Sequence, residues 1–291
     1  MPTTTRPDFS GYEPGVPGGG AGLVRLRLDV AYDGTDFSGW AAQPGRRTVA
    51  GVLLAELTRL LTLPTGLTVA GRTDAGVHAT GQVCHVDAPV AAWDQVRDTL
   101  LRRLAGLLPP DVRVTAVAAV PVGFDARFAA LGRRYEYRVT DAPWGADPLA
   151  ARYTLAWPRP LDLDALRAAA SGLTGKHDFA AYCRRKEHAT TVRAVSQLDW
   201  RREPDGVLVA TVAADAFCQS MVRSLVGALL AAGDGRQAPG WPAGLLSRQE
   251  RASEVAVAPP HGLTLVAVEY PADPADYARR AAATRARRSL A

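Results

Sequence analysis

The segment 71–79, Gly-Arg-Thr-Asp-Ala-Gly-Val-His-Ala, contains the residue types best suited to chemistry. Two glycines bracket a short loop that carries Arg72 and Asp74. A tight loop can hold a carboxylate rigidly, so that it acts as a nucleophile or transfers a proton. Asp and Gly are also ordinary turn residues, so composition alone favours a structural role for the loop. Hydrolysis of a glycosidic bond ordinarily uses two acids, and the other candidates, Asp33 and Asp36, lie in a different loop.

The remaining reactive side chains do not form the pattern of a metal or cofactor site. The three cysteines, Cys84, Cys183 and Cys218, lie far apart and form no CxxC motif, which argues against both a disulfide framework and a structural zinc. His78 and His85 lack the spacing of a standard metal site. The sequence has no GxxxxGK[ST] motif, no GxGxxG after a strand, and no HExxH or GxSxG motif. We therefore expect no metal and no cofactor.

The composition is that of a globular protein with a mildly basic surface. The chain has 291 residues, 47% hydrophobic and 22% charged, and a net charge of +5, which permits a polyanionic partner without requiring one. Of the 34 basic residues only Lys176 and Lys186 are lysines, and arginine is the better side chain for phosphates and base stacking. No apolar run approaches the roughly 20 residues of a membrane span, and the N-terminus has no secretory h-region. We expect a cytoplasmic protein that does not enter a membrane.

Hydrophobic periodicity predicts an α+β fold made of two similar halves. Alternating apolar residues predict strands, and apolar residues at helical spacing predict helices. The expected strands are 24–30, one ending near residue 70, 82–87, 112–120, 133–140, 194–200, 207–214 and 263–270, and the expected helices are 48–61, 93–107, 164–173 and 219–232. Each half then follows a β-α-β-β-α-β-like order. This order is typical of split βαβ units of the ferredoxin or RRM type, whose two sheets can join around a central active-site cleft.

Composition also divides the chain into four expected regions. Residues 1–22, rich in Pro, Gly and Thr, are predicted to be a disordered extension. Residues 23–122 form an N-terminal subdomain that carries the Asp74 loop, and residues 123–271 form a C-terminal subdomain. Residues 272–291 form a basic tail, which is predicted to be either a short helix or a frayed end. The tail is either exposed to solvent or contacts RNA nonspecifically.

Several further segments repeat a known family pattern in its order along the chain. They are YDGTDFSGW at 32–40, the helix from residue 48 to 57, FDARF at 124–128 with RRYEY at 133–137, GKHDF at 175–179, FCQSMVRSLVG at 217–227 and APPHGL at 258–263. Together with GRTDAGVHA, they resemble the TruA family of tRNA pseudouridine synthases. Two segments depart from the family pattern: Ala41-Ala42 after Trp40, and Cys218-Gln219-Ser220 before the MVR sequence.

The resemblance implies an enzyme that breaks the N1–C1′ bond of uridine and forms a C5–C1′ bond, which needs no cofactor. It assigns Asp74 as the nucleophile, which either attacks C1′ or assists formation of a glycal. Arg223 corresponds to the arginine that forms an ion pair with this carboxylate. Tyr135 corresponds to a tyrosine that stacks on the uracil and helps to remove the C5 proton. Arg72 and Arg127 are expected to bind substrate, at the gap left by the flipped base or at a nearby phosphate.

The resemblance also implies the partners. The family acts on the anticodon stem-loop of tRNA, at positions 38, 39 and 40, and forms homodimers. Recognition is expected to rest on tRNA shape and phosphates, because bases in an RNA duplex are hard to read. Two other functions remain open from the residues alone. An RNA-binding protein without chemistry would explain the basic loops but not the GRTDAG loop, and a glycosidic hydrolase lacks a second acid.

Overall fold

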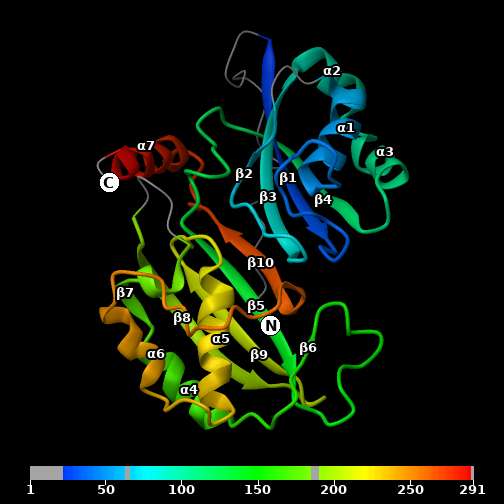
Figure 1. Ribbon diagram of the computed structural model, residues 1–291. Helices are drawn as coiled ribbons and strands as arrows, with labels where there is room; N and C mark the ends of the chain where they lie inside the picture. Colours follow the sequence, from blue (N-terminus) through cyan, green and yellow to red (C-terminus); the bar gives the residue numbers. More distant parts are fainter. Residues whose placement is uncertain (1–21, 63–65, 185–189, 290–291) are drawn as a thin grey trace.

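The computed structural model contains one mixed sheet of ten strands with helices packed against it (Figure 1). It describes residues 22–62, 66–184 and 190–289. The strand order is β4-β1-β3-β10-β5-β9-β8-β7, with β2 beside β3 and β6 beside β5. The predicted α+β class is therefore confirmed. The predicted disordered extension lies outside the described residues, apart from Gly22.

The first unit has the strand order β4-β1-β3-β2, which is that of a split βαβ fold. Its elements are β1 (Leu23–Tyr32), α1 (Val49–Leu61), β2 (Thr68–Val69), β3 (His78–Pro89), α2 (Val90–Val96), α3 (Leu100–Leu107) and β4 (Val112–Val120). Helix α1 begins where predicted, because the Thr48 hydroxyl accepts a hydrogen bond from the Gly51 amide at 3.2 Å. Leu53, Leu57 and Leu61 follow at four-residue intervals and are fully buried.

The second unit repeats this order as β10-β5-β9-β8. Its elements are β5 (Gly132–Thr140), β6 (Leu155–Ala156), α4 (Leu163–Ser171), β7 (Gly175–Asp178), β8 (Val192–Arg202), β9 (Leu208–Ala214), α5 (Met221–Gly233), α6 (Trp241–Gly244) and β10 (Leu263–Glu269). Figure 1 shows α4, α5 and α6 together over the strands of this unit. Helix α5 is buried over almost its whole length, because twelve of its thirteen residues are inaccessible to solvent.

The two units join through a short parallel pairing of β3 and β10. His78 and Ala79 at the start of β3 lie opposite Thr264 and Leu265 of β10. Strand β10 also pairs antiparallel with β5, where Leu265 lies opposite Tyr135. The register therefore aligns Ala79, just after the Asp74 loop, with Tyr135, and Leu265 of β10 lies between them.

Two local predictions need correction. The helix expected at 93–107 is divided into α2 and α3, and α2 begins at Val90, directly after Pro89. Between the two helices, the amide and the hydroxyl of Thr99 both donate to the Val96 carbonyl, at 2.9 and 3.2 Å. The apolar spacing continues across the break, so periodicity could not reveal it. The strand expected to end near residue 70 is only the two-residue β2.

The C-terminal segment forms a helix, α7 (Asp276–Ser289), so a frayed end is not what the structure shows. Tyr277 is completely buried at its start and contacts the ring of Phe124, with 5.2 Å between ring centroids. A membrane-spanning helix is absent from the described part of the chain.

Candidate active site

The loop that carries Asp74 connects β2 to β3 and is fixed through its neighbours. The buried hydroxyl of Thr73 forms a 2.7 Å hydrogen bond with the hydroxyl of Tyr32, at the end of β1. The amide of Trp40 donates to the Thr73 carbonyl at 3.1 Å, and the Gln82 side chain donates to the Gly71 carbonyl at 2.9 Å. The Asp74 side chain itself is 37% exposed. Hydrogen bonds to its neighbours therefore hold an accessible carboxylate in one place.

Three glycines allow other segments to approach this loop more closely than any side chain would permit. A Cβ on Gly34 would lie 2.0 Å from the Val77 carbonyl oxygen, and one on Gly76 would lie 2.8 Å from Pro260 Cγ. Gly39 has φ +93°, and a Cβ there would lie 3.0 Å from the Thr73 carbonyl oxygen. Gly34 and Gly39 are therefore needed for packing the YDGTDFSGW segment against the Asp74 loop, and Gly76 is needed for the approach of Pro260.

Arg223, in the first turn of α5, brings its guanidinium to Asp74. Its Nη1 lies 3.7 Å from Asp74 Oδ2, and the arginine side chain is 19% exposed. Its Nε donates to the Ala258 carbonyl at 2.7 Å, and the Ala258 amide donates back to the Arg223 carbonyl at 3.0 Å. One edge of the guanidinium is thus anchored while the other faces the carboxylate.

The segment 258–262 supports the site in a way that sequence reasoning missed. Besides the Ala258 contacts, the Pro259 carbonyl accepts a hydrogen bond from the Tyr137 hydroxyl at 2.9 Å. The His261 carbonyl lies 3.0 Å from His78 Nε2, and Pro260 packs against Gly76. This segment contacts α5, β5 and the Asp74 loop. Its sequence, APPHGL, matched the family pattern, but nothing in that pattern indicated these contacts.

Tyr135 is buried in β5 and points its ring toward Phe217. The two rings are 5.3 Å apart between centroids and nearly perpendicular, at 85°. Burial raises the pKa of the Tyr135 phenol to about 12; the Arg133 charge acts against this, and the Asp74 carboxylate acts with it. The phenol is therefore protonated at neutral pH. The structure brings together Asp74, Arg223 and Tyr135.

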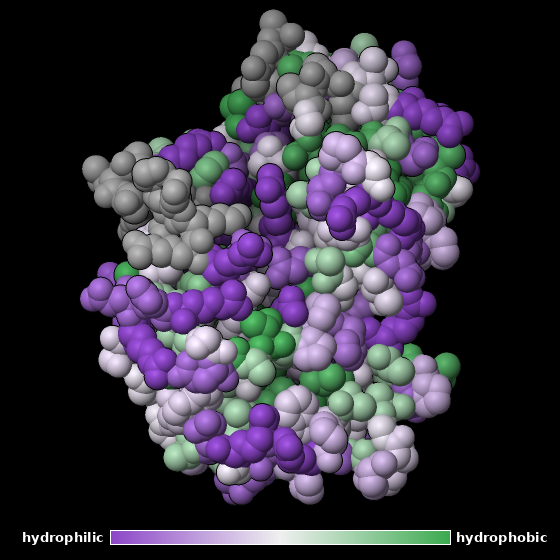
Figure 2. All heavy atoms as spheres, in the orientation of Figure 1, coloured by the Kyte–Doolittle hydropathy of each residue, from purple (hydrophilic) through white to green (hydrophobic). Residues whose placement is uncertain are grey.

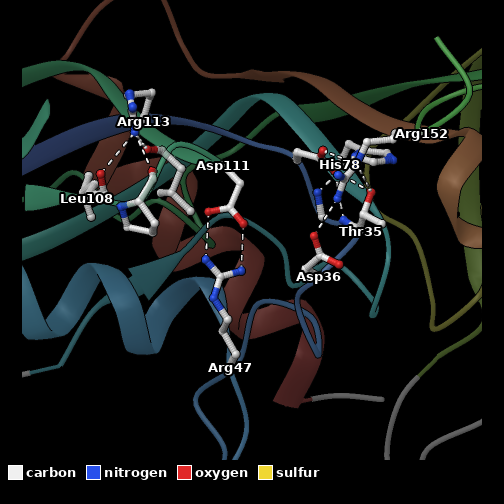
Figure 3. Close-up of polar contacts among 12 residues, drawn as sticks. Thr35, Asp36, Arg47, His78, Leu108, Asp111, Arg113 and Arg152 are labelled. Atoms are coloured by element: carbon white, nitrogen blue, oxygen red, sulfur yellow. Dashed lines mark hydrogen bonds and ion pairs between the residues drawn. The ribbon is translucent and has the colours of Figure 1, made fainter. Parts of the chain in front are cut away.

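The two other predicted site residues, Arg72 and Arg127, are exposed beside this group. Arg127 lies over the ring of Phe128 at 5.2 Å, and Arg72 has no hydrogen bond or ion pair to any residue in the described ranges. Neither is brought into contact with Asp74. Arg47, in the loop before α1, is held by Asp111 through two hydrogen bonds of 2.7 and 2.9 Å (Figure 3).

The other acids near the site are occupied by structural contacts. Arg152, from the loop between β5 and β6, binds Asp33 at 2.9 Å and Asp36 at 2.6 Å (Figure 3). Burial acts to raise the pKa of Asp33, but hydrogen bonds from Thr35 and the neighbouring positive charges hold it below the ordinary value. These aspartates therefore join the two units, and neither is a free second acid for hydrolysis.

Two histidines and two cysteines also have structural partners. His78 Nδ1 accepts from the Gly34 amide at 3.0 Å, and His85 Nδ1 accepts from the Ala126 amide at 3.1 Å. In the described part of the chain, no group of three potential metal ligands occurs. Cys183 and Cys218 form a disulfide, with Cα atoms 5.6 Å apart, so the argument against disulfides from cysteine spacing was wrong for this pair. The backbone bridge between Arg184 and Gln219 brings the two cysteines together across 35 residues.

Comparison with known proteins places this geometry in a family. The sequence profile described as tRNA pseudouridine synthase matches residues 169–271. The chain is similar to tRNA pseudouridine synthase A of Frankia casuarinae, with 61% identity over 91% of this chain and 96% of the relative. The proteins of the same name from Streptomyces griseus and Mycobacterium leprae are 56% and 54% identical over 92% and 91% of this chain, and over 95% and 96% of their own lengths. Among solved structures, a chain of a Cbf5–Nop10–Gar1 complex aligns with 72% of this chain and 54% of its own length, at 13% identity and a TM-score of 0.32. On the strength of the sequence matches, the chain belongs to the TruA family of tRNA pseudouridine synthases.

Proposed function

We propose that this protein converts uridine to pseudouridine at positions 38, 39 and 40 of tRNA, with Asp74 as the nucleophile. The membership of the family makes it an isomerase that acts on tRNA uridines. The observation that carries the residue assignment is the pairing of Asp74 with Arg223. The accessible carboxylate of Asp74 lies 3.7 Å from the largely buried guanidinium of Arg223. The guanidinium faces the carboxylate that is positioned to attack carbon.

The reaction requires the uracil to leave C1′ through N1 and to rejoin it through C5. Asp74 either bonds to C1′ or assists loss of a proton to give a glycal, and both routes need an ionised carboxylate. Because the phenol of Tyr135 is protonated at neutral pH, it can donate a hydrogen bond to the detached base while its ring stacks on the uracil. After C5 has bonded to C1′, the C5 proton is released to solvent and N1 takes up a proton, which completes the isomerisation without a net change in composition.

The target nucleotide must leave its stacked position before it can reach Asp74. Flipping costs a few kcal/mol, which contacts to the base and its phosphates must offset. Arg72 is two residues before Asp74 and exposed, which suits it to fill the space left by the base. Arg127 is exposed on the same unit junction and is suited to a phosphate. The whole site is proposed to act in the cytoplasm.

We also propose that two copies of the chain form a homodimer. The support is a group of large apolar side chains that the monomer leaves exposed in the loop between β5 and β6. Trp144 is 84% exposed, Leu149 is 91% exposed and Tyr153 is 41% exposed. Exposed apolar clusters of this kind are typical of contact surfaces. Sedimentation equilibrium of the wild type and of a Trp144→Ser, Leu149→Ser variant tests this, and a variant with the same mass as the wild type would contradict the contact.

The proposed function is tested by locating pseudouridine in tRNA. Unmodified transcripts that carry uridine at one of positions 38, 39 or 40 are incubated with the protein, and pseudouridine is mapped by carbodiimide labelling and primer extension. Transcripts with cytidine at these positions are the control. Product at 38–40 is expected, whereas product only at other positions would contradict the assigned target.

A further inference from the structure

The helix α7 is a concentration of positive charge beyond the segment that matches the family profile. The profile match ends at residue 271, and α7 begins at Asp276. Residues 272–291 contain five arginines and two aspartates, a net charge of +3 out of the +5 of the whole chain. The helix has fourteen residues and is therefore about 20 Å long, which is enough to span several nucleotides.

Helix α7 is fixed to the body of the protein by contacts along its length. Tyr277 is buried against Phe124. Ala278 packs closely on Gly123, since a Cβ added to Gly123 would lie 2.9 Å from the Ala278 methyl group. Further along the helix, Arg285 Nη2 lies 2.5 Å from Asp125 Oδ2. Because these contacts extend from Tyr277 to Arg285, the arginines Arg279 and Arg285 have a defined place on the surface.

The contacts place α7 beside Arg127. Asp125 joins the two, because its Oδ2 binds Arg285 while its Oδ1 accepts hydrogen bonds from the Arg127 and Phe128 amides, each at 2.8 Å. The guanidinium of Arg127 lies over the ring of Phe128 at 5.2 Å, and that of Arg285 lies over the same ring at 4.8 Å. Two cations thus share one ring with a single carboxylate between them. Such an excess of positive charge favours binding of a phosphate.

The same region is connected to the catalytic loop. Arg133, buried in β5, donates from Nη2 to the Arg127 carbonyl at 2.9 Å and to the Ala70 carbonyl at 2.8 Å. Ala70 immediately precedes Gly71 and Arg72. The surface formed by Arg127 and α7 therefore adjoins the loop that presents Asp74. In Figure 1, α7 lies at the left edge, level with the junction of the two units, and the coloured atoms near this edge in Figure 2 are mostly hydrophilic.

We propose that the exposed arginines of α7, together with Arg127, bind the phosphate backbone of the tRNA outside the nucleotide that is flipped. We call Arg279 and Arg285 the α7 arginines; their side chains are 80% and 54% exposed. This inference rests on the proposed function, since it takes tRNA as the substrate. It adds a binding element that lies outside the segment matching the family profile.

The test compares salt dependence of tRNA binding in matched variants. The experimental variants are Arg279→Gln and the double variant Arg279→Gln, Arg285→Gln. The control is Arg59→Gln, because Arg59 is also an exposed helical arginine, 67% exposed, paired with an acid three residues away. Binding of unmodified tRNA is measured by fluorescence anisotropy at several salt concentrations, with thermal melting in parallel.

The double variant is expected to bind about tenfold more weakly, and the slope of log affinity against log salt is expected to fall by about 1.4 to 1.8, as for two lost phosphate contacts. In turnover the loss should fall on KM more than on kcat. The double variant could fail to fold because the contact between Arg285 and Asp125 is lost. In that case Arg279→Gln alone tests the inference, and its slope of log affinity against log salt is expected to fall by about 0.7 to 0.9.

Wild-type affinity and slope in a folded variant would overturn the inference, as would weaker binding with an unchanged slope. An equal effect of Arg59→Gln would also overturn it, because the effect would then be one of general charge. Pseudouridine at a tRNA position other than 38–40 would overturn the proposed target while leaving the α7 result intact, so the two failures can be told apart.

Discussion

Replacement of Arg223 tests how the guanidinium contributes to the reaction. Two unit charges 3.7 Å apart attract by about 1 kcal/mol in bulk water and by about 4 kcal/mol at an effective dielectric constant of 20. Because Asp74 is 37% exposed, the value lies within this range. If the attraction acts on the reacting carboxylate, Arg223→Ala should reduce the rate about fivefold to a thousandfold. The carboxylate would lose both its counter-charge and a neighbour that limits its movement.

The variant Arg223→Lys separates charge from geometry. The guanidinium of Arg223 binds the Ala258 carbonyl through Nε and faces Asp74 through Nη1, which a single ammonium cannot do at once. We expect the lysine variant to recover little of the lost rate. The assay is single-turnover formation of pseudouridine at saturating enzyme, with melting temperatures to confirm folding. Arg248→Ala, which removes a surface ion pair of the same unit, is the control. A lysine variant as fast as the wild type would refute the geometric argument, and an alanine variant as fast would refute the role of the ion pair.

Three further predictions follow from single contacts. Tyr135→Phe should bind tRNA normally but form product more slowly, and equal product formation by both proteins would contradict a role for the hydroxyl. Because the pKa of the Tyr135 phenol is about 12, the wild-type rate should show no titration of this phenol below about pH 11. Gly39→Ala should lower the free energy of unfolding in urea by about 2–4 kcal/mol and slow the reaction, because φ is +93° and the Thr73 carbonyl oxygen would lie 3.0 Å from the new Cβ. Gly45→Ala is the control, since Gly45 has φ +68° but open space around it, and its unfolding free energy should fall by only about 1 kcal/mol. Burial, with the Arg25 charge adding to it, lowers the pKa of His85 from 6.5 to about 4, so unfolding takes up a proton between pH 4 and 6.5. The resulting stabilisation, up to about 3 kcal/mol, is complete above pH 6.5 and should be lost as the pH falls to 4. The urea-unfolding free energy of His85→Gln should depend less on pH in this range.

Much of the fold could be predicted because its elements have clear periods and caps. The strand 112–120 was predicted with its observed bounds, and the side chains of Thr48 and Asp162 cap α1 and α4 close to the predicted helix starts. These signals are local, since they depend on alternation and on one side chain near each helix start. The division between α2 and α3 was missed because Trp93, Val96, Leu100 and Leu104 keep helical spacing across it.

The parts of the site that could not be predicted depend on contacts between segments distant in the sequence. Asp74 and Arg223 were identified by residue type and family resemblance, but their 3.7 Å separation depends on the β3–β10 junction and on Ala258. The disulfide of Cys183 and Cys218 was missed for the same reason, because 35 residues separate the cysteines. Arg47 lies in a basic loop, and only the structure shows that Asp111 pairs with it across 64 residues.

The role of Asp74 as nucleophile is tested most directly by Asp74→Asn and tritium release. Asparagine has nearly the same size and tolerates the same turn conformations, so the variant should fold within about 1 kcal/mol of the wild type. It should bind tRNA as well as the wild type, because binding rests on many phosphate contacts. With tRNA tritiated at C5 of uridine, the wild type should release tritium, because C5 exchanges its hydrogen for the sugar bond, and the variant should release none. Substantial release by a folded Asp74→Asn variant would contradict the nucleophile assignment.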